Sequence, residues 1–197
     1  MQTEAEIYRH LREHRDELTP PPGFAWPEIS DGQILMMMSP SAGHDLNALL
    51  LSRQLSAQIS TDLLAATTAD FEDVALGKLR RPDVFVYPED EFIAAADRGD
   101  AGLDPHAMLL AIEIVSPSNP ENDYEGKLRD YPAMGIPHYL IVDPRDGTCT
   151  HHWAISSRSG APRYEGTAPY VFGDKITIGD WTLDTGQLRR YPKGTVR

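Results

Sequence analysis

The chain has 197 residues, of which 41% are hydrophobic and 24% charged, enough for one domain with a real core. Acidic residues outnumber basic ones by 30 to 18, so the formal net charge is −12. This charge argues against a general nucleic-acid coat protein and lowers, without excluding, the expectation of a nuclease. The single cysteine, Cys149, excludes intrachain disulfides and thiolate zinc clusters.

The ends and the composition of the chain suggest a simple organisation. The N-terminus is polar and acidic, and no apolar run approaches the ~20 residues of a membrane span. We therefore expect a cytoplasmic protein with no membrane partner. Because no repeat or composition shift marks a boundary, we expect a single domain over residues 1–197, with residues 1–22 as a peripheral helix and proline-rich connector.

The first half of the chain predicts a helix, a hairpin, a second helix and short strands. Apolar spacing predicts a helix over residues 3–18 and another over residues 44–59. Between them, residues 24–38 are typical of a hairpin with its tight turn at Asp31-Gly32. Residues 62–79 are mixed and predict one or two strands.

The second half predicts strands around one further helix. Residues 81–87 and 109–115 predict strands, and the near-continuous apolar character of residues 109–115 favours a buried central one. We interpret residues 88–105 as a variable excursion, one loose helix or partly disordered. Residues 120–134 predict a helix that Pro132 should kink or shorten. Further strands are expected at 138–142, 148–155, 170–172 and 175–178. This order indicates an α+β fold, with one mixed sheet and helices packed mainly on its faces.

Two acids stand in or beside these strands. Glu113 lies within an apolar run, where a carboxylate is costly to bury unless it is paired or bound to a cation. The alternatives are a buried ion pair, for which Lys127 is a candidate, or a metal ligand. Asp83 heads the strand at 81–87, and its alternatives are a turn cap or a pair with Arg80 or Arg81.

The acids and the lysine together suggest a divalent-metal site. Magnesium takes one or two carboxylates and keeps waters that can become nucleophiles. Asp83, Glu113 and the main-chain carbonyl of Ile114 would leave room for such waters and for a phosphate oxygen. Lys127 would orient the attacking water or stabilise charge on phosphorus. Asp123, four residues before Lys127, shares its helix face, so a surface ion pair is the alternative for both.

Basic and aromatic residues nearby are weaker candidates. Arg80 and Arg81 could flank a DNA backbone or form a solvated turn. His44 begins a helix, where a capping role is as well supported as contact with phosphate or metal. The sequence contains no phosphate-binding glycine loop, dinucleotide fingerprint or zinc-protease helix.

The spacing of these residues resembles known nucleases. Pro82-Asp83 followed by Glu113-Ile114-Val115 is similar to the PD-(D/E)XK motif. A longer pattern resembles the Uma family (the "Uma two" group) of restriction endonucleases. That pattern comprises Asp31-Gly32, Met38-Ser39-Pro40, His44, Ile112 to Ser118, Asp123, Lys127, Tyr131, Gly135 to Tyr139, Ile141 to Pro144 and Gly173 to Ile176.

The resemblance carries its own expectations. It implies a restriction-endonuclease-like mixed sheet flanked by helices, with an extra N-terminal hairpin and C-terminal strands. It implies that Asp83 and Glu113 bind Mg²⁺ or Mn²⁺ and that the motif lysine, absent at Val115, has moved to Lys127. The expected function is metal-dependent hydrolysis of DNA, with a homodimer left open. The alternatives are an RNA-directed nuclease and a non-catalytic interaction module that keeps the fold.

Overall fold

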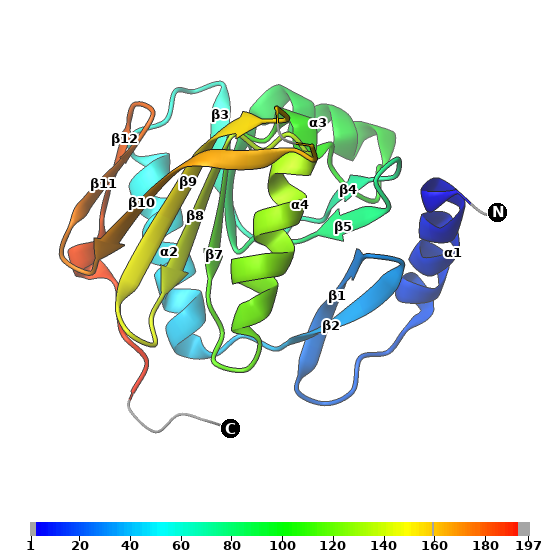
Figure 1. Cartoon of the computed structure of the whole chain (residues 1–197), viewed down its shortest axis with the longest axis horizontal. Helices are drawn as coiled ribbons and strands as arrows, with labels where there is room; N and C mark the ends of the chain where they lie inside the picture. The colour runs from blue at the N-terminus through cyan, green and yellow to red at the C-terminus, as the bar shows by residue number, and fades with distance from the viewer. Residues whose placement is uncertain (1–2, 159, 193–197) are drawn as a thin grey trace.

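A six-stranded mixed sheet forms the centre of the molecule, with strand order β10-β9-β8-β7-β6-β3 (Figure 1). The computed structural model describes residues 3–158 and 160–192. The strands are β3 (Leu63–Ala66), β6 (Val84–Pro88), β7 (Leu110–Ile114), β8 (His138–Asp143), β9 (Thr148–Ser156) and β10 (Arg163–Val171). β7 and β8 pair in parallel, while the other neighbours in this sheet are antiparallel. The parallel pair needs a crossover, which the helical segment after residue 119 supplies.

Alternating side chains of the central strands build two cores. On one face, Ile112 and Ile114 pack against helix α2 (Ala42–Ser56) and the two-stranded sheet of β11 (Lys175–Ile178) and β12 (Trp181–Asp184). On the other face, Ala111 packs against helices α3 (Glu89–Arg98) and α4 (Leu128–Ala133). Because neighbours on a strand point to opposite faces, Glu113 lies on the α4 side, as its spacing predicted.

The N-terminal hairpin belongs to a separate antiparallel sheet of order β2-β1-β5-β4. Its strands are β1 (Phe24–Ser30), β2 (Gln33–Met38), β4 (Phe71–Asp73) and β5 (Lys78–Arg80). Helix α1 (Glu4–Glu17) begins at the Thr3 cap and packs Tyr8 against this sheet. The expectation of one mixed sheet was therefore wrong in this respect, because the hairpin pairs with β5 and not with the central strands.

Two other segments differ from the predictions. Residues 81–87 do not form one strand: β5 ends at Arg80 in the small sheet, and β6 begins at Val84 in the central sheet. Between them, residues 81–83 cross from one sheet to the other. The expected loose excursion contains the ten-residue helix α3, because Phe92 and Ala95 pack on the second core and Gly99 ends the helix with φ 72°.

The helix after β7 begins at Pro120, as predicted, but contains a π turn. Residues Asn122–Lys127 form this turn, which is wider than an α turn, and α4 follows to Ala133. The helix ends one residue after Pro132, consistent with the expected shortening. Two 3-10 turns, Pro105–Ala107 and Thr185–Gln187, complete the elements described. Within the described residues, no helix has the length and apolar character needed to cross a membrane.

Candidate active site

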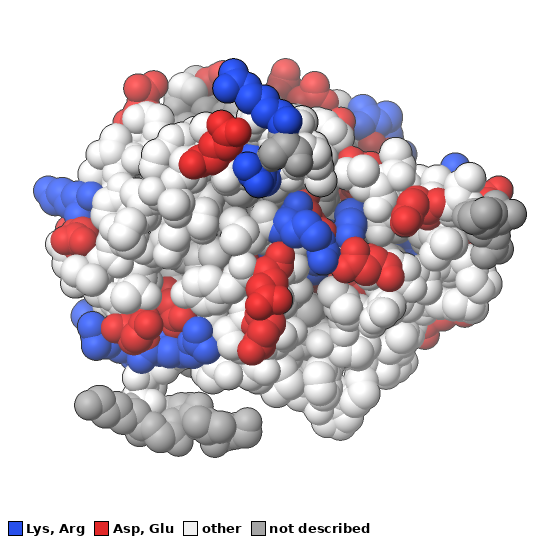
Figure 2. All heavy atoms as spheres, viewed as in Figure 1, with Lys and Arg blue, Asp and Glu red and all other residues white. Residues whose placement is uncertain are grey.

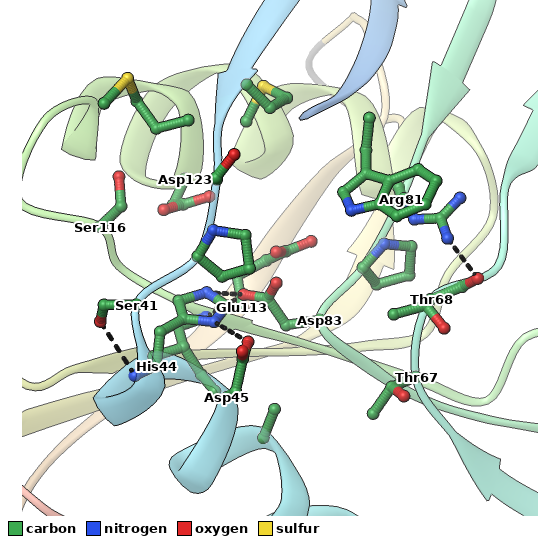
Figure 3. A pocket seen from close by; sticks show the side chains of 18 of the residues that line it. Ser41, His44, Asp45, Thr67, Thr68, Arg81, Asp83, Glu113, Ser116 and Asp123 are labelled. Atoms are coloured by element: carbon green, nitrogen blue, oxygen red, sulfur yellow. Dashed lines mark hydrogen bonds and ion pairs between the residues drawn. The ribbon is translucent and has the colours of Figure 1, made fainter. Parts of the chain in front are cut away.

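Asp83 and Glu113 come together at one end of the central sheet. β6 and β7 are antiparallel with Val84 opposite Ile112, so the residue before β6 lies beside the end of β7. Oδ2 of Asp83 accepts a hydrogen bond of 2.7 Å from the N–H of Ile114. Both acids line a cavity of about 1250 Å³ (Figure 3). The sequence predicted this convergence, and the extended strand geometry produces it.

His44 is the second partner of Asp83. Ser41 caps helix α2 by accepting a hydrogen bond from the N–H of His44, so the imidazole itself is not the cap. Its Nε2 lies 3.1 Å from Oδ2 of Asp83, and its Nδ1 lies 3.5 Å from Asp45 (Figure 3). Burial would lower the pKa of His44, but the charges and hydrogen bonds of Asp83 and Asp45 together outweigh burial and raise that pKa. The helix therefore presents the imidazole of His44 to the carboxylate of Asp83.

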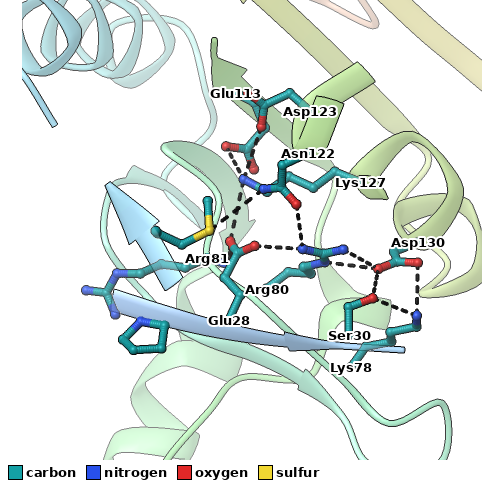
Figure 4. A network of polar contacts seen from close by, with 12 residues as sticks. Glu28, Ser30, Lys78, Arg80, Arg81, Glu113, Asn122, Asp123, Lys127 and Asp130 are labelled. Atoms are coloured by element: carbon teal, nitrogen blue, oxygen red, sulfur yellow. Dashed lines mark hydrogen bonds and ion pairs between the residues drawn. The ribbon is translucent and has the colours of Figure 1, made fainter. Parts of the chain in front are cut away.

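Lys127 lies inside the site and not on the surface. Its side chain is 3% exposed, and its Nζ lies 2.7 Å from Oε2 of Glu113 (Figure 4). Oδ1 of Asp123 is 3.4 Å away and Oε1 of Glu28 is 3.5 Å away. Asp123 and Lys127 are thus a buried pair and not the surface pair that was the alternative. One ammonium group holds three carboxylates from two sheets and one helix.

The crowding of acids perturbs their pKa values. Burial raises the pKa of Glu113 well above its ordinary range, and the charges of Asp83, Asp123 and Glu28 add to this against the opposing effect of Lys127. Burial likewise raises the pKa of Asp123 to about 6. For Lys127, burial favours the neutral amine, but the surrounding carboxylates dominate and raise its pKa. The lysine therefore stays charged, while Glu113 and Asp123 hold their protons more tightly than ordinary carboxylic acids do.

Tyr131 and Val115 complete the surroundings of Glu113. The hydroxyl of Tyr131 donates a hydrogen bond to Oε1 of Glu113, so both oxygens of this carboxylate are engaged. Val115, at the usual position of the motif lysine, is buried in the core on the α4 side. Tyr131 was noted in the sequence pattern, but its contact depends on the helix docking against the sheet, which spacing alone does not specify.

The side chain of Arg80 is buried and cannot reach a DNA backbone at the surface. Its side chain is 1% exposed, and it donates to Glu28 at 2.7 Å, to Asp130 at 2.5 Å and to Asn122 at 3.1 Å (Figure 4). Both alternatives from the sequence, a contact with a DNA backbone and a solvated turn, were wrong for this residue, because β5 turns its guanidinium into the interface between the small sheet and the helix. Arg80 instead ties Glu28 to the segment that carries Lys127.

Arg81 points the other way and lines the cavity. Its guanidinium donates to Asp70 at 2.7 Å and to the carbonyl of Thr68 at 2.6 Å (Figure 3). Its backbone N–H donates to Oε1 of Glu28 at 3.0 Å. Arg81 therefore lies at the cavity with its charge offset by Asp70, and its contact with a substrate stays a prediction.

Glu28 is the residue that the sequence analysis missed. It is 1% exposed and contacts both Lys127 and Arg80, whose charges outweigh its burial and lower its pKa. The signal for Glu28 was the same as for Glu113, a carboxylate inside a predicted strand. Its flanking residues are less uniformly apolar, so the pattern was weaker.

The donor set fits a hard divalent cation with few protein ligands. Among the described residues, no group of three or more His, Cys, Asp or Glu side chains is arranged to hold a metal ion. Oδ2 of Asp83 has two hydrogen-bond partners, Nε2 of His44 and the N–H of Ile114. Oδ1 of Asp83 has no hydrogen-bond partner among the described residues. Mg²⁺ usually binds one or two carboxylates and retains water, so Oδ1 of Asp83 is available to such an ion, while both oxygens of Glu113 already contact Tyr131 and Lys127.

Comparisons with known proteins identify the family and the fold of the chain. The model of the Uma2 family, described as "Putative restriction endonuclease", matches residues 16–167. No curated protein matches the chain in sequence. Among solved structures, the chain is similar to a "putative nuclease belonging to DUF820" from Anabaena variabilis ATCC 29413. The TM-score is 0.65 at 14% identity, over 95% of this chain and 97% of that one, which establishes a shared fold.

Proposed function

We propose that this chain, which belongs to the Uma2 family of restriction endonucleases, is a metal-dependent endonuclease that hydrolyses phosphodiester bonds in DNA. The observation that supports the proposal most is the position of Lys127. A charged lysine with 3% exposure, within 3.5 Å of three carboxylates and beside a large cavity, is a costly arrangement for stability alone. Perturbed titratable groups gathered in a cavity are typical of active sites.

Each residue has a definite part in the proposed site. Asp83 and Glu113, with the main-chain carbonyl of Ile114, would hold Mg²⁺ or Mn²⁺. The bound metal would act as a Lewis acid toward the phosphate and lower the pKa of a bound water. Lys127 carries the positive charge that stabilises negative charge on phosphorus or orients the attacking water. His44 holds the carboxylate of Asp83 in place through Nε2.

The supporting residues keep this geometry fixed before substrate arrives. Tyr131 orients Glu113 by its hydroxyl hydrogen bond. Glu28 holds Lys127 from the small sheet, and Arg80 holds Glu28 in turn. Groups that are already oriented need little reorganisation in the transition state, which is the main source of electrostatic catalysis.

Cleavage of plasmid and single-stranded DNA tests the proposal directly. Wild-type protein should cleave with Mg²⁺ or Mn²⁺ and stop when EDTA is added. Asp83→Ala should reduce the rate by at least about 100-fold. Glu165→Gln, which removes an exposed carboxylate on β10, is the matched control and should leave the rate unchanged. Retained melting temperatures in both variants would exclude misfolding as the cause of lost cleavage.

The alternatives give different outcomes in the same assays. Faster cleavage of RNA than of DNA would favour an RNA-directed nuclease. The net charge of −12 favours a non-catalytic interaction module. That module would show no cleavage with any divalent metal and no Mg²⁺ or Mn²⁺ binding by calorimetry, and this pair of results would refute the nuclease.

A further inference from the structure

Trp26 is an exposed aromatic side chain at the cavity that contains Asp83 and Glu113. Its side chain is 53% exposed, although it belongs to the strand β1. The register of β1 against β2 is interrupted between Ala25 and Glu28, which is the signature of a β-bulge. Within that irregularity the backbone of Trp26 has φ 48°, a conformation that residues other than glycine rarely adopt. The strand is thus distorted where the ring is presented to solvent, and such distortions are frequent beside functional sites.

Arg81 lies against the same ring. The centre of its guanidinium is 4.2 Å from the ring centroid of Trp26, and its contacts with Asp70 and Thr68 hold it there. Arg81 is two residues before Asp83, so this stacked pair is directly connected to the proposed metal ligand. Arg81 thus holds the ring of Trp26 in place, and about half of the side chain remains exposed to solvent. The exposed part of the ring is a preformed surface on which a planar group can stack.

Charge around the cavity argues against recognition through phosphates. The acids Glu28, Asp45, Asp83, Glu113 and Asp123 line it, against the bases Arg81 and Lys127 and the imidazole of His44. Over the face drawn in Figure 2, Lys and Arg side chains lie in separate groups next to acidic ones. Binding through the nucleic-acid backbone depends on many cationic contacts, which this cavity lacks. A nucleic acid that reaches the acids needs another source of affinity.

Exposed apolar side chains supply such a source. Met38, on the strand paired with β1, is 41% exposed, and Leu49 on α2 is 52% exposed; both line the cavity with Trp26. The faces of nucleobases are planar and apolar, and they stack on aromatic side chains whatever the base. In a duplex these faces are covered by neighbouring bases, so the ring can receive only a base that is unpaired or turned out of its stack.

We infer that Trp26, backed by Arg81, stacks an unpaired nucleobase next to the scissile phosphate, so that the substrate is single-stranded or locally unpaired nucleic acid. The inference rests on the proposed nuclease function for the identity of the substrate. A binding measurement separates the two, because stacking does not require cleavage.

The experiment uses a fluorescein-labelled short single strand of deoxyadenosines with phosphorothioate linkages, and its affinity is measured by anisotropy in Mg²⁺. Trp26→Leu keeps an apolar side chain without a π face and should weaken binding about fivefold or more. Trp26→Phe should restore most of the affinity. Ile93→Ala, which removes an apolar side chain that is 54% exposed on α3, is the matched control and should bind as the wild type.

An abasic strand of the same length and charge provides the decisive comparison. Wild type should bind it more weakly, and Trp26→Leu should bind both strands alike. Equal binding by wild type and Trp26→Leu, or no binding of single strands by wild type, would overturn the inference. Trp26-dependent binding without any cleavage would instead retain the stacking site and refute the nuclease. Cleavage that is indifferent to Trp26 would retain the nuclease and refute the stacking site.

Discussion

Lys127 shows how one residue can serve both stability and chemistry. Three carboxylates surround its ammonium, and the fold has withdrawn all of them from water. Removing one partner of a buried pair leaves the other charge uncompensated, which typically costs about 3–5 kcal/mol. The lysine that we propose to act on phosphate is therefore also the counter-ion of the site without metal.

The first prediction separates these two contributions. Lys127→Met should lower the free energy of unfolding by about 3 kcal/mol in EDTA and should abolish cleavage. The double variant Lys127→Met, Glu113→Gln should recover part of that stability, because one uncompensated charge disappears, but should recover no activity. Urea denaturation and a plasmid assay measure the two effects. Equal stability of the single and double variants would contradict the role of Lys127 as a counter-ion.

The second prediction concerns Asp123, which is 6% exposed. Burial, reinforced by the charges of Asp83 and Glu28, raises its pKa in the folded protein to about 6 from the ordinary value of 3.8. The folded protein therefore binds its proton more tightly than the unfolded chain does. Stability should decrease as pH rises from about 4 through 6, by about 3 kcal/mol.

Asp123→Asn should remove this part of the pH dependence. The test compares the free energy of unfolding of the two proteins in EDTA at roughly pH 4.5 and pH 7.5, on either side of the pKa of Asp123 in the folded protein. The variant should be more stable than wild type at the higher pH and similar to it at the lower pH. A constant difference at both pH values would show that Asp123 does not titrate in this window.

At the scale of elements, the connection between β5 and the helix controls the geometry of the site. Arg80 extends from β5 toward Asp130 on α4, while Ser30 and Lys78 also contact that carboxylate. Burial would raise the pKa of Asp130, but the charges of Arg80 and Lys78 and the hydrogen bonds from Ser30 and Arg80 together outweigh burial, and the pKa falls to about 2. The small sheet is therefore attached to the helix by a charged contact and not by apolar packing alone.

The third prediction follows from that contact. Because the folded pKa of Asp130 lies below its unfolded value of 3.8, its contribution is present above pH 4 and is lost as pH falls toward 2. Asp130→Asn should cost about 2 kcal/mol at pH 6 and almost nothing at pH 2. Denaturation curves at these two pH values provide the measurement, with Asp97→Asn on the exposed end of α3 as the control. A cost that persists at pH 2 would indicate a steric and not an electrostatic effect.

Elements with a clear period could be predicted from the sequence, and those decided by distant packing could not. The hairpin around Asp31-Gly32, helix α2 and strand β7 follow from local turn chemistry and apolar spacing. The separation of β5 from β6 could not be predicted, because it depends on β5 pairing with β1 about 50 residues away. Helix α3 was underestimated, because its short apolar face is stabilised by the core.

The candidate site divides in the same way. Asp83, Glu113 and Lys127 were found because acids beside apolar runs and a known spacing are visible in the sequence. Glu28 comes from the other sheet, and only the crossing of residues 81–83 between the sheets brings it to Lys127. The exposure of Trp26 could not be predicted from the sequence, because it depends on the irregularity in β1.

At the scale of the whole molecule, the acidic balance sets how nucleic acid can bind. The net charge is −12, and the cavity is lined by more acids than bases. The fourth prediction is that the affinity for single strands falls only gently with salt. The slope of log K against log salt should be about −2 or shallower, against about −10 for a strongly basic binder. Anisotropy titrations at several salt concentrations measure this slope, and a slope near −6 would contradict it.

The π turn at Asn122–Lys127 determines where the chain can tolerate the insertion or deletion of a single residue. Tyr131 lies eight positions after Asp123. In a regular α-helix, the two side chains would point in directions about 80° apart around the helix axis. The wide turn absorbs one residue, so both side chains face Glu113. A deletion of exposed Glu125 should convert the turn to a regular helix and still leave Asp123 and Tyr131 on the same side. The same deletion within β7 would turn Glu113 toward the opposite core, so natural gains and losses of single residues should be found in the helix and not in the strand.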